Sequence, residues 1–327
     1  MCIRDRTKGI EMTAKSYTCW IITEGMAGTE NQCIGIAEHL GYPYSIKKIQ
    51  LNNPWKTLSP YIGFEQDYSF SPKLSPPWPD ILIASGRKSI AASRYIKKMS
   101  KGHTFTVQVQ DPRVSENHFD LLAIPEHDPL RGSNVIVTKA SPNKITQDTL
   151  TKEKEAFPEF ENLRSPRIAV LIGGSSKAYN MTHEITENLA NKLQDLDGSL
   201  MITCSRRTGI INQKILETKL KKDTNYFWTG SGNNPYLAFL AWADYILVTA
   251  DSASMISESC TTGKPVYMIE LDGGKKRISS LHNNLIKHGA LRIFDGSLEK
   301  YEYTPLNDAK HVADAIKKEF KIFTRSS

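Results

Sequence analysis

Small polar residues interrupt an apolar run at 245–258 in a pattern that suits phosphate binding. The apolar stretch 245–248 is followed by Thr-Ala-Asp-Ser-Ala-Ser at 249–254, and a helical stretch then continues through Glu258. Small residues let a ligand approach the backbone, and the first N–H groups of the helix point at it. The residues predicted to bind a donor substrate here are Ser252, Ala253, Ser254, Met255 and, for the hydroxyls of a ribose or sugar, Glu258. The alternative is an N-capped helix of an ordinary α/β core with an exposed Glu258.

Two further turns follow apolar strands in the same half of the chain. Residues 167–172 lead into Gly173, Gly174, Ser175 and Ser176, and residues 200–204 lead into a turn that contains Arg206 and Arg207. Ligands of open parallel sheets bind outside the carboxyl ends of the strands, so these turns are expected to face one crevice. Guanidinium groups bind phosphate oxygens in pairs. Both turns are therefore added to the predicted donor site, although a Gly-Gly-Ser turn also occurs in ordinary βα loops.

The first half of the chain supplies candidates for an acceptor side and for a general base. Strand 17–23 runs into a small-residue turn with Gly25 and Gly28. A base must lie within hydrogen-bond reach of the hydroxyl that it deprotonates. Asp111, at the end of the apolar strand 104–110, is the first choice, with Glu30 and His127 as competitors. An Asp that only begins an Asp-Pro turn is the plain alternative for Asp111.

The elements that must position these residues alternate between strand-like and helical stretches. Strands are predicted at 17–23, 45–49, 80–84, 104–110 and 121–124, and then at 167–172, 200–204, 225–228, 245–249 and 266–269. This alternation predicts an α/β fold with two doubly wound, Rossmann-like domains of parallel strands. The expected division is an N-terminal domain at 17–145, a linker at 146–166, a C-terminal domain at 167–306 that carries the phosphate-type turns, and a helix at 307–327 that packs back on the first domain. Residues 1–16 are expected to be disordered or an artefact of start assignment.

Composition narrows the class of protein. The chain has 327 residues, 39% of them hydrophobic, and a formal net charge of +7, which allows two domains with proper cores and favours an anionic partner. No apolar run approaches the roughly 20 residues of a membrane span. The five cysteines form no CxxC pair, which argues against a metal cluster or a disulfide framework. Basic residues are dispersed and no nucleic-acid-binding motif is present, so nucleic acid is not an expected partner.

Four ordered segments together resemble the mitochondrial fission "elongated mitochondria" family of candidate glycosyltransferases. They are Glu-Gly-Met-Ala-Gly-Thr-Glu-Asn-Gln at 24–32, Gln-Asp-Pro-Arg at 110–113 with Pro-Glu-His-Asp at 125–128, Ser-Arg-Arg-Thr at 205–208, and Asn-Pro-Tyr at 234–236 leading to Asp251. The segments of the first half add Asn31, Gln32 and Arg113 to the predicted acceptor side. The second half also resembles the donor half of the peptidoglycan UDP-N-acetylglucosamine transferase family. These resemblances imply a GT-B fold, in which Ser175 and the turn at 252–255 face a diphosphate and Glu258 takes the ribose.

The function predicted on these grounds is glycosyl transfer from a nucleoside-diphosphate sugar, without a metal or other cofactor. Helix N-termini and the side chains of Arg206, Arg207, Lys276 and Arg277 would neutralise the leaving group. Asp195-Leu196-Asp197 has the DxD spacing of metal-using transferases but precedes a glycine and is interpreted as a turn. The alternatives are a nucleotide-sugar epimerase of GT-B shape and a catalytically silent GT-B scaffold involved in mitochondrial or membrane organisation.

The acceptor remains open, with lipid-linked molecules and cell-envelope glycans as candidates. Residues 51–79 are rich in aromatic residues and proline, and they are expected either to touch a membrane surface or to form a packed irregular loop. The expected location is the cytoplasm, with peripheral contact to the inner face of a membrane as an option.

Overall fold

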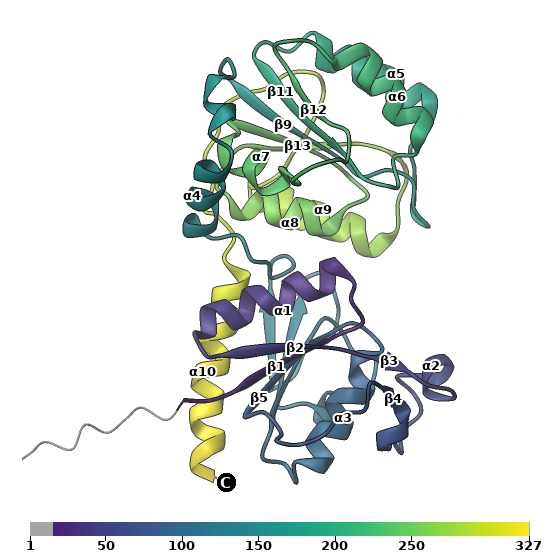
Figure 1. Cartoon of the computed structure of the whole chain (residues 1–327), viewed down its shortest axis with the longest axis vertical. Coiled ribbons are helices and arrows are strands. Elements are labelled where there is room, and N and C mark those ends of the chain that lie inside the picture. The colour runs from purple at the N-terminus through teal and green to yellow at the C-terminus, as the bar shows by residue number, and fades with distance from the viewer. Residues whose placement is uncertain (1–15, 327) are drawn as a thin grey trace, which may run out of the picture.

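The computed structural model describes residues 16–326, which form two α/β domains stacked along the long axis of the molecule (Figure 1). The expectation for residues 1–16 therefore lies almost wholly outside the described residues. Each domain is built on a six-stranded parallel sheet with helices on both faces. The predicted fold of two doubly wound domains is confirmed.

The N-terminal sheet has the strand order β2-β1-β5-β6-β7-β8. Its strands are β1 (Cys19–Thr23), β2 (Tyr44–Lys48), β5 (Ile81–Ser85), β6 (Phe105–Val109), β7 (Leu121–Pro125) and β8 (Val135–Thr138), and the helices of this domain are α1 (Ala27–Leu40), α2 (Trp55–Leu58) and α3 (Ser89–Met99). A short hairpin of β3 (Gln50–Leu51) and β4 (Phe70–Ser71) lies beside α2. Alternate residues of a strand point to opposite faces. Ile21 and Ile83 accordingly pack with α1, whereas Ile22 and Leu82 pack with α3.

The C-terminal sheet has the strand order β12-β11-β9-β13-β14-β16. Its strands are β9 (Arg167–Ile172), β11 (Ser199–Cys204), β12 (Tyr226–Trp228), β13 (Tyr245–Thr249), β14 (Val266–Ile269) and β16 (Arg292–Ile293), with a separate hairpin of β10 (Tyr179–Asn180) and β15 (Asp272–Gly273). The helices are α5 (His183–Gln194), α6 (Ile210–Leu220), α7 (Tyr236–Trp242), α8 (Ala253–Thr261) and α9 (Lys276–Lys287). Almost every residue of β9 and β13 is buried, as expected for a parallel sheet covered on both faces.

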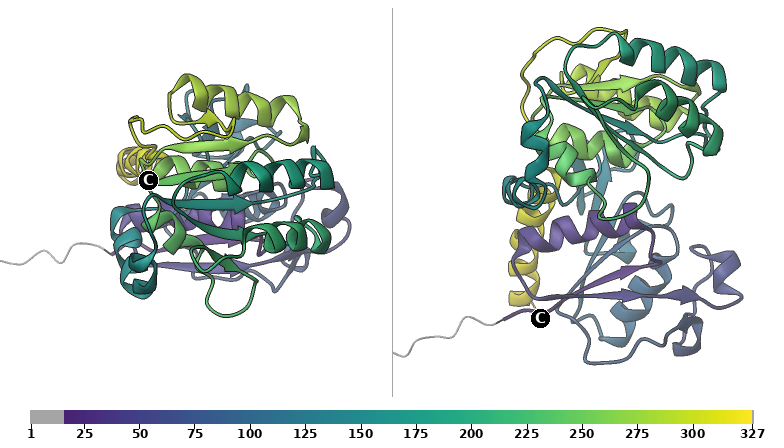
Figure 2. Two further views of the ribbon diagram at one scale, coloured as in Figure 1. Left: turned by 90° about the horizontal axis from the view of Figure 1, so that it is seen from above. Right: turned by 45° about the horizontal axis from the view of Figure 1, so that its top comes forward.

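The chain crosses between the domains twice. The outward crossing leads to α4 (Gln147–Ala156), which lies against α7, and the return leads to α10 (Asp308–Ser326), which packs beside α1 in the N-terminal core. Figure 2 shows this helix running along the side of the N-terminal domain. The Asp308 carboxylate accepts from the backbone N–H groups of Lys139 (2.9 Å) and Ala140 (3.0 Å), so one side chain joins the two crossings.

Candidate functional site

Both sheets reverse their strand order beside their first strand, and the two points of reversal lie on the cleft between the domains. In the N-terminal sheet β1 lies between β2 and β5, and in the C-terminal sheet β9 lies between β11 and β13. Ligands of open α/β sheets bind at such points, outside the carboxyl ends of the strands. The helix that follows each point faces the other domain: a Cβ added at Gly28 of α1 would lie 3.2 Å from Ser254 Oγ of α8. The predicted donor and acceptor turns therefore meet.

The N-terminus of α8 offers free backbone donors to this cleft. Ser252 caps the helix, and its Oγ accepts from the N–H group of Met255 at 3.4 Å. Among residues 16–326 the N–H groups of Ala253 and Ser254 donate no hydrogen bond. These groups, with the positive end of the helix dipole behind them, can receive an anion.

The Gly-Gly-Ser-Ser turn after β9 is held mainly by internal hydrogen bonds. The N–H group of Gly173 donates to Thr249 Oγ1 (2.7 Å), that of Ser175 to the Arg207 carbonyl (3.1 Å), and that of Ser176 to the Tyr179 carbonyl (2.8 Å). These three donors are therefore engaged within the protein. Their assignment to the donor diphosphate stays a prediction.

The two arginines after β11 differ in their surroundings. Arg207 donates from Nη2 to Asp251 Oδ2 at 2.7 Å, and the Asp251 side chain is fully buried. Thr249 Oγ1 donates to the other carboxylate oxygen at 2.7 Å, so both oxygens are satisfied. Arg206 is exposed. Arg207 thus neutralises a buried carboxylate of its own domain, whereas Arg206 is free to bind a ligand anion.

Glu258 lies one turn beyond Ser254 on α8 and is 6% exposed. Tyr236 Oη donates to Glu258 Oε2 at 2.5 Å, and this hydroxyl fixes the orientation of the carboxylate. Burial raises the pKa of the Glu258 carboxyl, and the Tyr236 hydrogen bond and the charge of Lys144 oppose that shift. Sequence reasoning singled out the Asn-Pro-Tyr segment without finding this role, because only the fold brings Tyr236 to a residue 22 positions away.

A cavity of about 320 Å³ lies between the domains beside the N-termini of α8 and α9. Its lining residues are Gln110, Pro125, His127, Ser141, Ala253, Lys275, Arg277, Ile278 and Leu281. Lys275, Lys276 and Arg277 stand at the N-terminus of α9, where the first turn has no acidic residue. Arg277 Nη2 donates to the buried Asp128 Oδ2 at 2.5 Å across the cleft.

The three candidate bases occupy different positions. His127 lines the cavity, and its buried Nδ1 has no hydrogen-bond partner among the described residues. Burial lowers the pKa of the His127 imidazole, with Arg277 acting in the same direction and Asp128 opposing it. Asp111 Oδ1 accepts from the Arg113 N–H group at 2.8 Å and so begins a turn, and Glu30 of α1 lies 3.7 Å from Lys48 Nζ. Of the three, His127 is the one that borders the cavity.

Comparisons with known proteins identify the family of this chain and agree with its fold of two domains, each with one parallel sheet. A family model described as mitochondrial fission ELM1 matches residues 27–320. The chain belongs to this family. It is 33% identical over 273 residues to the mitochondrial fission protein ELM1 of Arabidopsis thaliana, covering 74% of this chain and 64% of that relative. This chain therefore spans less than two thirds of the Arabidopsis protein.

Further matches agree with the family and the fold. Uncharacterized protein RP120 of Rickettsia prowazekii (strain Madrid E) is 28% identical, covering 93% of this chain and 98% of that protein. Among solved structures, the UDP-GlcNAc 2-epimerase of Methanocaldococcus jannaschii aligns with a TM-score of 0.58 at 13% identity, covering 92% of this chain and 99% of that chain. The same enzyme in complex with UDP-GlcNAc and UDP aligns with a TM-score of 0.51 at 12% identity. At these identities the likeness concerns the fold, which is of the GT-B type.

The other predicted acceptor-side residues of this ELM1-family chain lie around α1 and the strands beneath it. Gln32 is buried, and its Oε1 accepts from Ser85 Oγ and from Gln110 Nε2, each at 3.1 Å. Gly25 has a φ of +86° in the turn before α1, and Asn31 is half-buried on the helix. Arg113 is exposed with a φ of +57°. Gln32 thus joins α1 to the carboxyl ends of β5 and β6.

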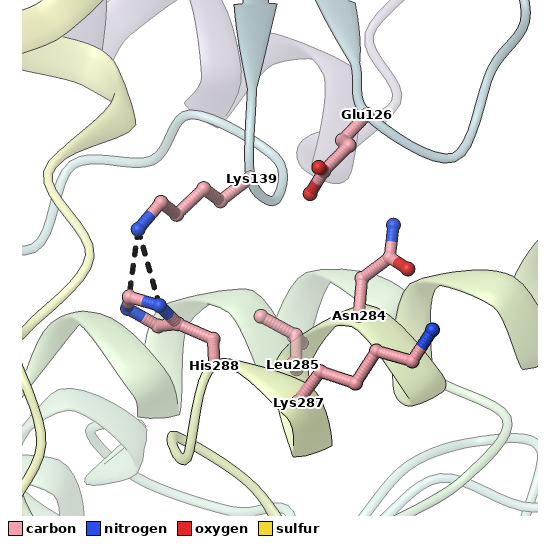
Figure 3. Close-up of a pocket in the computed structure, with 6 residues that line it drawn as sticks. All are labelled: Glu126, Lys139, Asn284, Leu285, Lys287 and His288. Carbon is pink, nitrogen blue, oxygen red and sulfur yellow. Dashed lines mark hydrogen bonds between the residues drawn. The ribbon is translucent and has the colours of Figure 1, made fainter.

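A second cavity between the domains, of about 360 Å³, is mainly cationic. Figure 3 shows Glu126 entering from the end of β7, and Asn284, Leu285 and Lys287 from α9 on the opposite side. Lys139 Nζ lies 3.1 Å from His288 Nδ1. This cavity lies next to the first one, because the neighbouring residues Glu126 and His127 line one each.

Residues 16–326 contain neither a cluster of metal-ligating side chains nor a helix that could span a membrane. No group of three or more His, Cys, Asp or Glu side chains is placed to hold a metal ion. Asp195 and Asp197 lie in a turn at the amino end of β11, away from the cleft, and Asp197 pairs with Arg164. The prediction that this DxD sequence forms a turn is confirmed. In the same residues no helix has the length and apolar character required to cross a bilayer.

His282 of α9 is expected to make the protein sensitive to acid. Its side chain is 5% exposed, its Nε2 has no hydrogen-bond partner among the described residues, and burial lowers its pKa to about 4. The unfolded chain takes up this proton near pH 6.5, so the free energy of unfolding should fall by up to about 3 kcal/mol as the pH drops from about 6.5 to about 4. Urea unfolding at several pH values should show this slope in the wild type and a smaller one in His282→Gln. The exposed His103 supplies the control, and an equal change in His103→Gln would contradict the assignment.

Proposed function

We propose that this chain is a glycosyltransferase that binds a nucleoside-diphosphate sugar in the interdomain cleft and transfers the sugar without a metal ion. The observation that carries this proposal is the cavity of about 320 Å³ between the N-terminus of α8 and the cationic N-terminus of α9. Its size lies at the lower end of the range of small-molecule sites. Both helix N-termini and the side chains beside them suit a diphosphate.

Electrostatics at α9 support an anionic ligand. Lysine and arginine are unfavourable at a helix N-terminus, by roughly 0.3–1 kcal/mol each when exposed. Lys275, Lys276 and Arg277 accumulate there, and among residues 16–326 only Arg277 finds a carboxylate partner, Asp128. A diphosphate would offset the repulsion and would also stabilise negative charge on the leaving group, which is the role that a metal ion has in other transferases.

The residues of the cleft would have distinct roles in this reaction. The free N–H groups of Ala253 and Ser254, with Arg206, bind the diphosphate, and Tyr236 holds Glu258 toward the ribose hydroxyls. His127 deprotonates the acceptor hydroxyl, with Asp111 and Glu30 as the competing candidates. The acceptor enters from the side of α1, where Gly28 allows the close approach of the two domains. We propose the cytoplasm as the location of this activity.

A second candidate is epimerisation of the nucleotide sugar itself, which uses the same donor site without an acceptor. It is favoured by the alignment over 92% of this chain with a UDP-GlcNAc 2-epimerase. The two activities are separated by incubating the protein with UDP-GlcNAc alone. Conversion to a second UDP-sugar would support the epimerase, whereas release of UDP only when an acceptor extract is added would support the transferase.

Donor binding is tested by calorimetric titration with UDP and UDP-GlcNAc. We expect Arg206→Ala and Lys275→Ala each to weaken binding by roughly tenfold or more, because each removes a charge-assisted contact to a phosphate oxygen. The control is Lys222→Ala, which also removes one positive charge. Lys222 is exposed and precedes β12 at the amino end of that strand, so this variant should bind like the wild type. A wild-type protein that binds neither UDP nor UDP-GlcNAc, nor any other nucleotide sugar, would instead indicate a catalytically silent scaffold.

A further inference from the structure

A group of exposed aromatic side chains projects from the N-terminal domain beside α2. Tyr61, Phe64 and Tyr68 are 66%, 87% and 58% exposed, and Leu58 at the end of α2 is 50% exposed. We call these four residues the aromatic knob. In Figure 1 α2 and the β3–β4 hairpin stand out from the edge of the domain, so the knob lies on a convex part of the molecule.

The segment that carries the knob is held firmly. Arg94 of α3 donates to the carbonyl oxygens of Pro60 (2.8 Å) and Ile62 (2.6 Å) and forms an ion pair with the buried Glu65. Trp55 Nε1 donates to the Gly63 carbonyl at 3.1 Å, and the Trp55 ring packs in the core. The loop backbone is therefore fixed on both sides of Phe64, and the rings are exposed by an ordered loop.

Phe64 combines a strained backbone conformation with an exposed ring. Its φ is +59°, a left-handed conformation that costs energy for a bulky residue and suits Asn or Gly. The ring is 87% exposed, so its contribution to the folded core is small. Strained residues of this kind concentrate at functional sites. Folding alone gives no reason for a phenylalanine here.

Two cationic side chains, Arg87 and Lys56, lie beside the knob, and the exposed Asp67 is paired with Lys73. The Arg87 guanidinium lies 5.3 Å from the centre of the Tyr61 ring, and its Nε donates to the Ser59 carbonyl at 2.8 Å. Lys56 of α2 is exposed, and the whole chain carries a net charge of +7. Tyrosine rings beside cations, with an apolar phenylalanine at the tip, match the chemistry of a lipid headgroup region, where aromatic rings insert and cations contact anionic lipids.

We propose that the aromatic knob docks the protein on an anionic phospholipid bilayer. The rings enter the headgroup region of one leaflet, and Lys56 and Arg87 contact lipid phosphates. A projecting group of side chains suits a bilayer, because a fluid surface can adapt to the shape of the knob. For residues 51–79, expected either to pack or to touch a membrane, the structure shows that Trp55 and Phe70 pack in the core, and the proposal assigns the membrane contact to the knob.

The test is co-flotation of the full chain with vesicles of phosphatidylcholine alone and of phosphatidylcholine with phosphatidylglycerol. The variant is Tyr61→Ser with Phe64→Asn, because asparagine tolerates the left-handed backbone and the protein should fold without loss of thermal stability. The control is Ile210→Ser with Ile211→Ser, which removes two side chains of 87% and 61% exposure from the other domain.

We expect the wild type to bind the anionic vesicles, less so at 0.5 M salt, and the knob variant to partition at least about tenfold more weakly. The Ile210/Ile211 control should bind like the wild type. Wild-type binding by the knob variant, or an equal loss in the control, would overturn the proposal. So would the absence of wild-type binding together with a concentration-dependent dimer that the knob variant abolishes, since the occupant would then be a second copy of the chain.

Discussion

His127→Gln is expected to slow release of the nucleoside diphosphate from its sugar by about 10²–10⁴-fold, the usual contribution of a positioned proton acceptor. His127 lines the cavity, and its pKa is lowered by burial, so the imidazole is neutral at pH 7 and able to accept a proton. Glutamine keeps a similar polar shape without this capacity. Donor affinity measured by titration should stay within a few-fold of the wild type, because the proposed phosphate contacts lie in the C-terminal domain, at Arg206 and at the N-termini of α8 and α9.

The pH profile provides a readout that a structural role of His127 would not produce. In the wild type the turnover should fall as the pH drops below the pKa of the His127 imidazole, which burial lowers, because the base becomes protonated there. This acidic limb should be missing in the residual activity of His127→Gln. Asp111→Asn is the matched comparison, since its carboxylate begins a turn outside the cavity. If Asp111→Asn loses turnover while His127→Gln keeps it, Asp111 is the base and the sequence ranking was the better one.

The strands next to the cleft were the most predictable elements, because buried parallel strands are continuous apolar runs. The strand predicted at 245–249 is β13, and that predicted at 200–204 is β11 without its first residue. Of the two six-stranded sheets, the missed strands are β8 and β16, which lie at the sheet edges. β16 has two exposed residues and gives no apolar run, whereas β8 is an apolar Val-Ile-Val-Thr segment that the prediction did not include. The two-residue strands β3, β4, β10 and β15 of the hairpins are missed as well.

The turns of the candidate site could be predicted from the sequence, but the side-chain pairs that support it could not. Strand-turn-helix patterns placed Ser252 and Gly28 correctly at the carboxyl ends of strands, since the parallel sheet brings these ends to one edge. The pairs Tyr236–Glu258 and Asp128–Arg277 join residues 22 and 149 positions apart, and no local pattern encodes them. His282 gave no local signal either, because its lowered pKa results from burial that only the packed α9 creates.

Gly174→Ala is expected to lower the free energy of unfolding of the ligand-free protein by about 3 kcal/mol or more. Gly174 has a φ of +137°, and a Cβ there would lie 2.2 Å from the carbonyl oxygen of Arg207. Neither the backbone of Gly174 nor that of Arg207 can move freely, because Ser175 donates to this same carbonyl and Arg207 is paired with Asp251. Urea denaturation without any nucleotide measures the loss.

Gly41→Ala separates this steric demand from the cost of a left-handed backbone alone. Gly41 ends α1 with a φ of +75° and has no atom within 4 Å of an added Cβ, so its replacement should cost about 1 kcal/mol. A clearly larger loss at Gly174 would mean that the turn after β9 needs glycine for its own packing, whatever ligand it later meets. Equal losses at the two positions would remove that explanation, and the close approach of a phosphate would again be the better reason for the glycine.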